Sequence, residues 1–315
     1  MKRLLIFPAF FVMLILAACA PINPLARSVT PPAQGDLHRA QGAYAAGNYT
    51  LAIEYLGRAI QSGELDETGL AEAYYDRGVA YSAQGEYELA LADFQQALRL
   101  KPDFTQAAVS MGALYNAMGE HAKAVTILTA LIRAKPEAAA AYYNRGNAYV
   151  AQGKFQQALA DYNRALQLEA NNAETYYNRG NVYFMLGQWQ PAISDYTQAI
   201  RLEPRHVMAY NNRGIAYRAL EQHRKAIADY DQAIRIAPDL YGTYNNRGNA
   251  YSALGEWRKA IVDYDRALRL NPASAEAYYN RGLAYEALGQ MARAKEDFKK
   301  AADLNQRQGR GIQGP

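Results

Sequence analysis

Residues 139–172 read AAAYYNRGNAYVAQGKFQQALADYNRALQLEANN, and residues 173–206 read AETYYNRGNVYFMLGQWQPAISDYTQAIRLEPRH. The two stretches of 34 residues share Tyr-Tyr-Asn-Arg-Gly near the start, a glycine near the middle and Asp-Tyr in the second half. Each stretch contains two apolar patterns of helical period, and the central glycine separates them. The sequence therefore predicts that each stretch forms two helices joined by a short turn.

The same spacing continues through most of the chain and resembles the tetratricopeptide repeat (TPR). A glycine recurs every 34 residues, with tyrosine three residues later and alanine twelve residues later. With that glycine at position 8, an eighth and weaker repeat fits 33–66, and an insertion at 67–70 follows it. The seven strong repeats are 71–104, 105–138, 139–172, 173–206, 207–240, 241–274 and 275–308.

The predicted fold class is all-α, a TPR α-solenoid of about eight helix-turn-helix repeats. A single helix pair cannot bury its apolar face, whereas stacked pairs bury a continuous core. Small residues at positions 8, 20 and 27 let two helices approach closely, and large aromatic residues at positions 4, 11 and 24 fill the space between repeats. The resemblance implies a right-handed superhelix whose concave side is lined by the first helix of each repeat.

Arginine occupies position 7 of six strong repeats, where the TPR pattern has leucine, and aspartate occupies position 23 of the same six. Repeat 105–138 carries Met111 and Ile127 instead, so both positions change together. Because a buried arginine without a partner is costly, we expect structural ion pairs. A ladder of arginines that bind anions is the alternative. The expected pairs are Arg77–Asp93, Arg145–Asp161, Arg179–Asp195, Arg213–Asp229, Arg247–Asp263 and Arg281–Asp297.

The N-terminus has the features of a secretory leader. Lys2 and Arg3 precede the apolar run 4–18, which is shorter than the roughly 20 residues of a membrane-spanning helix. The run ends in Leu-Ala-Ala-Cys, and its Cys19 is the single cysteine of the chain. This ending resembles the lipobox of bacterial lipoproteins. An uncleaved anchor helix with an inert cysteine is the alternative.

The lipobox resemblance implies a signal peptide at 1–18 and a lipid on Cys19. Ala20 follows the cysteine, which by similarity to Gram-negative lipoproteins favours an outer-membrane anchor with the protein facing the periplasm. Residues 19–32 form a proline-rich linker that we expect to be extended rather than helical. Residues 309–315 are expected to form a flexible tail.

Positions 2, 5, 6, 9, 12 and 13 face the groove in the TPR family, and here they carry many amides and tyrosines. An amide offers a donor and an acceptor, as a peptide backbone does. The pattern resembles the asparagine ladder of the O-GlcNAc transferases. That these asparagines are copies from duplication, or bond to the scaffold, remains open. The candidate binding residues are Asn144, Asn147, Asn178, Asn181, Asn212, Asn246, Asn249, Asn280, Tyr143, Tyr177 and Tyr279.

The asparagine pattern stops before repeat 139–172. Asp76 and Ser110 occupy position 6 of the two preceding repeats, whose groove positions are more apolar. This part of the groove could serve self-association into a homo-oligomer. The carboxylate clamp that captures chaperone C-termini is excluded, because positions 2, 5 and 6 of the strong repeats carry no lysine or arginine. Arg218, at position 12, is the one basic residue at the groove positions, so we expect a neutral or mixed protein segment as the ligand.

Signals for chemistry are weak. The four histidines lack metal-ligand spacing, and neither GxSxG nor a Walker A motif occurs. A GxGxxG match in the C-terminal tail follows a helical repeat rather than a strand, so it is a chance match. A net charge of +4 excludes a strongly basic nucleic-acid binder. We therefore expect no catalytic residues, no metal, no cofactor and no nucleic acid.

The sequence predicts a membrane-anchored periplasmic scaffold that binds other envelope proteins or extended peptides. Its architecture is similar to that of NlpI-like adaptors of peptidoglycan enzymes and of the pilotins of pilus secretins. The alternative is a peptidoglycan- or carbohydrate-binding envelope protein, because tyrosine and asparagine together stack on sugars and hydrogen-bond to them. An enzyme or its obligate subunit, and a purely structural role, are the remaining hypotheses.

Overall fold

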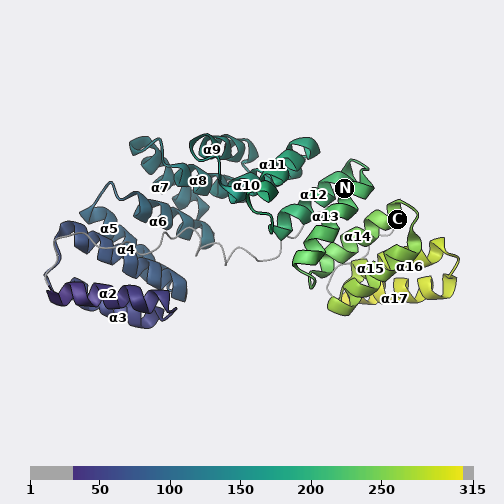
Figure 1. The fold of residues 1–315 in the computed structure, drawn as a ribbon, viewed down its shortest axis with the longest axis horizontal. Helices are drawn as coiled ribbons and strands as arrows, with labels where there is room; N and C mark the ends of the chain where they lie inside the picture. Colours follow the sequence, from purple (N-terminus) through teal and green to yellow (C-terminus); the bar gives the residue numbers. More distant parts are fainter. Residues whose placement is uncertain (1–30, 308–315) are drawn as a thin grey trace. The chain divides into compact units, whose positions relative to one another are not determined.

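The computed structural model describes residues 31–307, and sixteen helices follow one another in that range. They form consecutive pairs joined by short turns (Figure 1). The helices are α2 (Pro31–Ala45), α3 (Tyr49–Gln61), α4 (Glu67–Gln84), α5 (Tyr87–Leu100), α6 (Thr105–Ala117), α7 (His121–Ala134), α8 (Ala139–Ala151), α9 (Phe155–Leu168), α10 (Ala173–Met185), α11 (Trp189–Leu202), α12 (Val207–Ala219), α13 (His223–Ile236), α14 (Tyr241–Ala253), α15 (Trp257–Leu270), α16 (Ala275–Ala287) and α17 (Met291–Arg307).

The described residues divide into two compact units, with the boundary between Ala170 and Asn171. The described part of the first unit holds α2 to α9, and that of the second holds α10 to α17. Within each unit every helix packs against the next one in sequence. The predicted all-α TPR solenoid is therefore the observed fold class.

The turn inside each repeat needs a residue in the left-handed conformation at position 15. Glycine supplies it in most repeats, as Gly153 does with φ 70°. In repeat 207–240 the position is taken by Glu221, which adopts φ 58°. A side chain in that conformation costs about 1 kcal/mol, so the helix pairing imposes the turn even without glycine.

The glycine at position 8 lets the two helices of a repeat touch through one ring. A Cβ added at Gly146 would lie 2.7 Å from Cε1 of Tyr162, at position 24, and Tyr162 is 1% exposed. The same overlap occurs at the equivalent glycine of all seven strong repeats. Position 24 therefore fills the hollow over the glycine of its own repeat, rather than the space between repeats that we expected.

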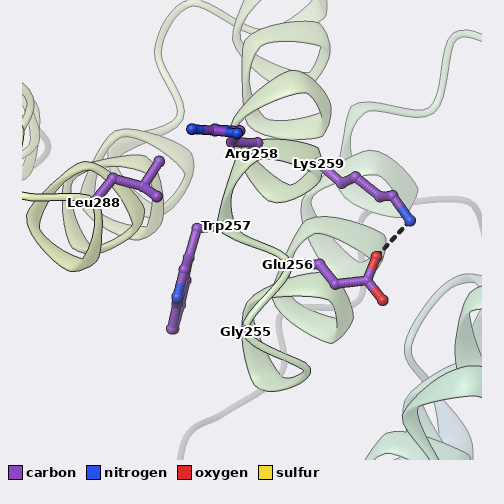
Figure 2. A pocket seen from close by; sticks show the side chains of 6 residues that line it. All are labelled: Gly255, Glu256, Trp257, Arg258, Lys259 and Leu288. Carbon is purple, nitrogen blue, oxygen red and sulfur yellow. Dashed lines mark ion pairs between the residues drawn. The ribbon is translucent and has the colours of Figure 1, made fainter.

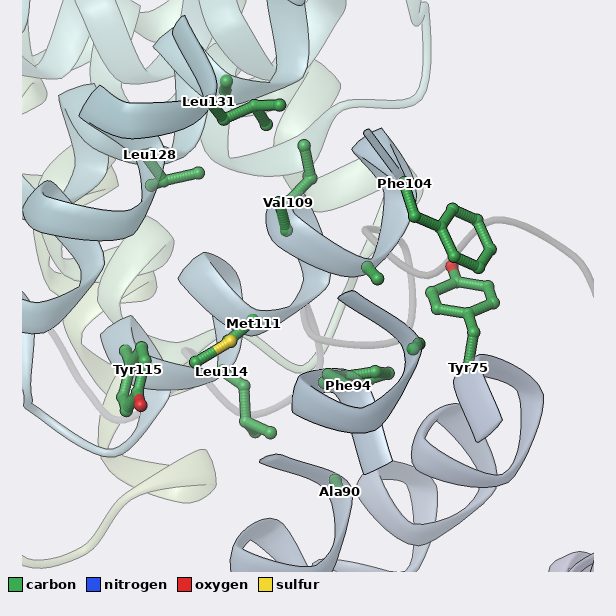
Figure 3. Packing of buried hydrophobic residues seen from close by; sticks show 14 of the residues in the cluster. Tyr75, Ala90, Phe94, Phe104, Val109, Met111, Leu114, Tyr115, Leu128 and Leu131 are labelled. Atoms are coloured by element: carbon green, nitrogen blue, oxygen red, sulfur yellow. The ribbon is translucent and has the colours of Figure 1, made fainter. Parts of the chain in front are cut away.

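The largest apolar cluster of the first unit surrounds repeat 105–138, the repeat that departs from the pattern (Figure 3). Leu128 covers Gly112 and is fully buried, Leu114 is 1% exposed, and Met111 is 7% exposed. Leucine and methionine thus replace the ring and the ion pair of the other repeats without opening the core.

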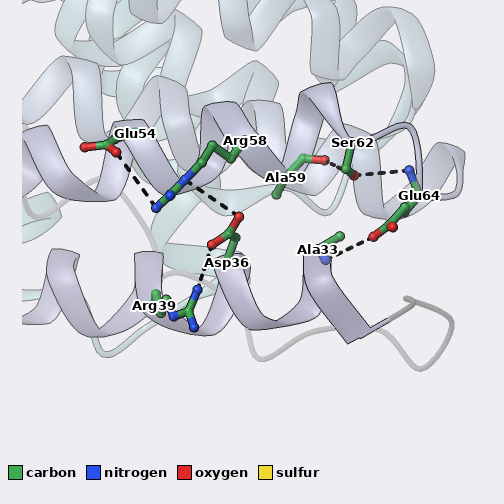
Figure 4. Close-up of polar contacts among 8 residues, drawn as sticks. All are labelled: Ala33, Asp36, Arg39, Glu54, Arg58, Ala59, Ser62 and Glu64. Carbon is green, nitrogen blue, oxygen red and sulfur yellow. Dashed lines mark hydrogen bonds and ion pairs between the residues drawn. The ribbon is translucent and has the colours of Figure 1, made fainter.

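The first helix pair is held by a different polar network. Arg58 lies 3.7 Å from Asp36 and 3.9 Å from Glu54, and the Ala33 backbone N–H donates to Glu64 (Figure 4). Arg39 lies 6.0 Å from the Tyr55 ring, at the positions where later repeats have the Arg–Asp pair. This pair therefore packs as a repeat without that ion pair.

Helix α2 begins at Pro31, so the prediction that residues 19–32 are non-helical is wrong for its last two residues. Proline is tolerated in the first turn of a helix because the N–H that it lacks has no intrahelical partner there. The predicted signal peptide 1–18, Cys19 and the tail 309–315 lie outside the described residues. Among residues 31–307, every helix is too short or too polar to cross a membrane.

Candidate protein-binding surface

All six predicted Arg–Asp pairs are formed, with closest nitrogen–oxygen distances of 2.6–2.8 Å. In repeat 139–172, Arg145 Nε and Nη2 each lie 2.8 Å from an oxygen of Asp161, which is 5% exposed. This bidentate geometry joins the first helix of the repeat to its second.

Each arginine also makes contacts that the sequence pattern did not reveal. Arg145 Nη1 donates to Thr129 Oγ1 of the preceding repeat at 3.0 Å. The guanidinium lies 5.7 Å from the Tyr142 ring and 5.8 Å from the Tyr149 ring, which are positions 4 and 11. All three nitrogens of Arg145 are therefore engaged, which argues against the alternative in which these arginines bind anions.

Burial of these pairs is costly. Burial raises the pKa of Asp229 even though Arg213 hydrogen-bonds to it and opposes the shift. The same balance raises the pKa of Asp195 and of Asp263. The arginine therefore offsets only part of the cost of removing the carboxylate from water.

The position-6 asparagines of the second unit reach back to the preceding repeat. Asn212 Nδ2 donates to Asn181 Oδ1 at 3.0 Å and to Tyr177 Oη at 3.2 Å. Two further pairs follow this pattern, at 3.2 and 3.3 Å, namely Asn246 with Asn211 and Asn280 with Asn245. The asparagines thus bond to the scaffold, and because an amide has two N–H groups and two acceptor lone pairs, each keeps some capacity for a ligand.

The position-9 asparagines accept a hydrogen bond from the tyrosine at position 24 of the same repeat. Tyr162 Oη donates to Asn147 Oδ1 at 2.6 Å, and the hydroxyls of Tyr196 and Tyr264 donate to Asn181 and Asn249, both at 2.8 Å. Sequence comparison could have found this pairing, because repeats with phenylalanine or leucine at position 24 have an apolar residue at position 9.

The remaining candidate residues differ in exposure. Asn144 is 5% exposed, and its amide donates to the Ala140 carbonyl at 2.9 Å. The position-5 tyrosines pack against the ring at position 24, with centroids 6.2 Å apart for Tyr143 and 5.9 Å apart for Tyr177. Tyr279, in the last repeat, is 52% exposed. Asn178 is half-buried.

Asp76 occupies position 6 in the first unit without the bonds of the later asparagines. It is 5% exposed, and within residues 31–307 its carboxyl has no hydrogen bond or ion pair. Burial, and then the charge of Glu72 one turn away, raise its pKa well above the usual range. The buried carboxyl without a partner therefore destabilises the folded state at this position.

We expect Asp76→Asn to raise the free energy of unfolding by about 1–2 kcal/mol at neutral pH. Because the pKa of Asp76 is raised, the folded state binds the proton more tightly than the unfolded state does. Wild-type stability therefore falls as the pH rises through the folded pKa, and the advantage of the variant shrinks as the pH is lowered towards the unfolded pKa of about 4. Urea unfolding across this pH range measures the difference, with Glu88→Gln, at an exposed position of α5, as the control. A pH-independent difference would contradict the assignment to Asp76 ionisation.

Three potential metal ligands, Glu174, Glu203 and His206, bring their donor atoms within 4.8 Å of one another. His206 Nδ1, however, accepts from the Ala209 backbone N–H at 3.3 Å and caps α12. A neutral imidazole with an accepting Nδ1 carries its proton on Nε2, which lies 3.4 Å from Glu174 Oε1. Metal binding at Nε2 would require moving that proton to Nδ1, against the Ala209 N–H. His206 is therefore assigned as a helix cap.

A surface pocket lies beside the turn before α15 and is lined by Trp257, Arg258 and Leu288, among others (Figure 2). Its acidic residue, Glu256, is already paired with Lys259 at 2.5 Å. The lining holds neither a nucleophile–base pair nor a histidine, so the pocket offers no catalytic arrangement.

Two family models match the chain and together cover more than half of it. One, described as tetratricopeptide repeat, matches residues 71–104, 173–206, 207–240 and 275–308, with the repeat boundaries predicted above. The other, described as TPR repeat, matches 146–187 and 248–289. Neither description is that of a catalytic domain.

The chain is also similar to individual proteins that contain tetratricopeptide repeats, and to solved structures. The tetratricopeptide repeat and J domain-containing co-chaperone DNJ1 of Cryptococcus neoformans is 43% identical over 77 residues, which are 24% of this chain but only 14% of that protein. A crystal structure of MamA is 29% identical with a TM-score of 0.50, covering 52% of this chain and 96% of that one. YrrB, described as a TPR protein with an unusual peptide-binding site, is 25% identical with a TM-score of 0.51, covering 57% and 92%.

Proposed function

Because the chain belongs to the tetratricopeptide-repeat family, we propose that it is a scaffold that binds extended segments of other proteins in a bacterial cell envelope. The supporting observation is the series of half-buried amides at position 6 of α12, α14 and α16, which keep hydrogen-bonding capacity beyond their bonds to the scaffold. An amide offers the same donor and acceptor groups as a peptide backbone, so a row of amides can bind an extended segment through its N–H and C=O groups. YrrB, a structural relative, has a peptide-binding site.

The proposed location follows from the leader. A lipid on Cys19 would hold the scaffold at the outer membrane, facing the periplasm. Each CH₂ group buried in the membrane contributes about 0.8 kcal/mol, so several acyl chains together would give stable anchoring. At such a site it would act as an adaptor in peptidoglycan-enzyme or pilus and secretion assembly. Its partners would be other envelope proteins, and its N-terminal repeats would be the place for self-association.

Crosslinking in cells, followed by identification of the captured proteins, tests the scaffold. We expect the triple replacement of Asn178, Asn212 and Asn246 by alanine to remove most of the captured protein while the helical circular dichroism is unchanged. Gln156→Ala with Gln157→Ala removes two exposed amides from α9 and is the matched control. Unchanged capture by the triple variant would reject the asparagines as the binding surface.

We expect Cys19→Ser to abolish acyl labelling and to move the protein from the membrane fraction to the soluble fraction. The sulfur is the atom that the lipid would be attached to, and serine cannot take its place in the lipobox. Metabolic labelling with a fatty-acid analogue and fractionation measure both effects. A labelled serine variant, or an unlabelled wild type, would overturn the anchor.

A carbohydrate-binding function is the second candidate. Tyr241 and Tyr279 are 45% and 52% exposed, and such rings can stack on sugars. Sedimentation with purified peptidoglycan separates the two functions, because the scaffold without a carbohydrate site stays in the supernatant.

A further inference from the structure

Tyr230 breaks the pairing between positions 24 and 9. The tyrosines at position 24 on either side of it in sequence donate to an asparagine at position 9, as Tyr264 does to Asn249. Position 9 of repeat 207–240 is Ile215, which cannot accept. Tyr230 is fully buried, and its O–H has no acceptor among the described residues.

The hydroxyl is not needed for packing. In repeat 275–308 position 24 is Phe298, whose ring lies over Gly282 as that of Tyr230 lies over Gly214. A tyrosine without an acceptor is therefore retained where phenylalanine would pack equally well and leave no unsatisfied polar group.

The same repeat carries the one basic residue at the groove positions. Arg218 is at position 12, where the next repeat has Ser252, whose Oγ lies 3.0 Å from Tyr264 Oη. The Nε of Arg218 is buried and, within the part of the chain that the structure describes, has no partner. Burial raises the pKa of Tyr230, and the nearby Arg218 guanidinium opposes the shift. Burial also raises the pKa of Tyr264 to about 12, against the opposing effects of the Ser252 hydrogen bond and of the Arg218 charge. The guanidinium therefore lies close to both hydroxyls.

We propose that Arg218 and Tyr230 form a carboxylate-binding site within the scaffold surface, with Arg218 Nε–H and Tyr230 O–H as donors. Two neighbouring buried donors, one of them charged, require an acceptor that carries a negative charge and more than one oxygen. An acidic side chain or a C-terminal carboxylate of the bound segment supplies both. This inference rests on the proposed function. It states which chemical group in a bound protein segment the surface would prefer, although the asparagines bind the segment through its backbone.

Three probes test the site on the full chain. Each is an acetylated nonapeptide of glycine, serine and asparagine. The first has a central glutamate and an amidated C-terminus, the second has glutamine in its place, and the third has glutamine and a free C-terminal carboxylate. We expect wild type to bind the first or the third at least about fivefold more tightly than the second by calorimetry. The arm that binds identifies the source of the carboxylate.

Variants that copy neighbouring repeats separate the site from folding. Arg218→Ser copies Ser252 and removes the charge, and Tyr230→Phe copies Phe298, so we expect both to fold and to lose the carboxylate preference wholly or in large part. Arg224→Ser, at an exposed position of α13, is the control and keeps it. Equal binding of all three probes, no binding of any, or a preference that survives Arg218→Ser would overturn the site. Those outcomes leave the scaffold proposal standing, because protein capture in cells tests it separately.

Discussion

Replacing Asp229 by alanine is expected to lower the free energy of unfolding by about 3–5 kcal/mol, because it leaves a largely buried guanidinium without its countercharge. Arg213 Nε and Nη2 lie 2.8 and 2.7 Å from the oxygens of Asp229, which is 6% exposed. The remaining polar contact of Arg213, from Nη1 to Thr197 Oγ1 at 2.9 Å, is with a neutral hydroxyl and cannot replace the charge. Urea unfolding followed by circular dichroism measures the loss.

The chain contains its own control for this experiment. Met111 and Ile127 occupy the same two positions in repeat 105–138, so Arg213→Met combined with Asp229→Ile copies a packed arrangement that already exists. We expect the double variant to recover to within about 1 kcal/mol of wild type, or to exceed it, because both desolvation costs disappear. A double variant as unstable as the single one would show that shape, and not charge, sets the cost.

Phe94→Ala is expected to cost about 3–5 kcal/mol through the cavity that it leaves. Phe94 is fully buried, its ring lies 5.8 Å from that of Tyr75, and its Cε1 would be 2.7 Å from a Cβ on Gly78 (Figure 3). Glycine has no side chain that could move into the space, so the cavity stays open. Urea unfolding and hydrogen exchange of α4 and α5 measure the effect.

Phe94→Leu is the matched comparison, since Leu128 fills the same position of the next repeat. We expect it to cost about 1 kcal/mol, because leucine keeps contact with Gly78 and leaves a smaller void. Similar losses in both variants would indicate that the position tolerates an empty hollow.

Features that lie inside one repeat could be predicted from the sequence. The helix pairs follow from hydrophobic period and glycine spacing, and the Arg–Asp pairs follow from positions 7 and 23 changing together at Met111 and Ile127. The start of α2 at Pro31 could not, because the proline content of the linker says nothing about which prolines lie in a first turn.

Contacts between side chains of adjacent repeats could not be predicted from the repeat pattern. Whether Asn212 meets Asn181 or a ligand depends on how far the first helices of adjacent repeats are shifted and rotated, and a repeat unit alone does not carry that information. The position of the Arg145 guanidinium between two tyrosine rings has the same origin. The pairing of Tyr162 with Asn147, in contrast, lies inside one repeat, and the apolar residues at position 9 of repeats with phenylalanine or leucine at position 24 indicate it.

The arginine at position 7 also contacts position 25 of the preceding repeat, so its environment depends on which repeat comes before it. Arg213 uses Thr197 of the preceding repeat, and Arg247 uses Asp231 in the same way. Excising residues 207–240 as a block would bring Arg247 to Thr197, a hydroxyl that already accepts from an arginine. Loss of this 34-residue repeat therefore leaves the Arg247 guanidinium with a polar neighbour, whereas a deletion of another length would shift the register of these contacts. A gene rearrangement that removes this repeat would therefore shorten the series of repeats without requiring a new type of contact between neighbouring repeats.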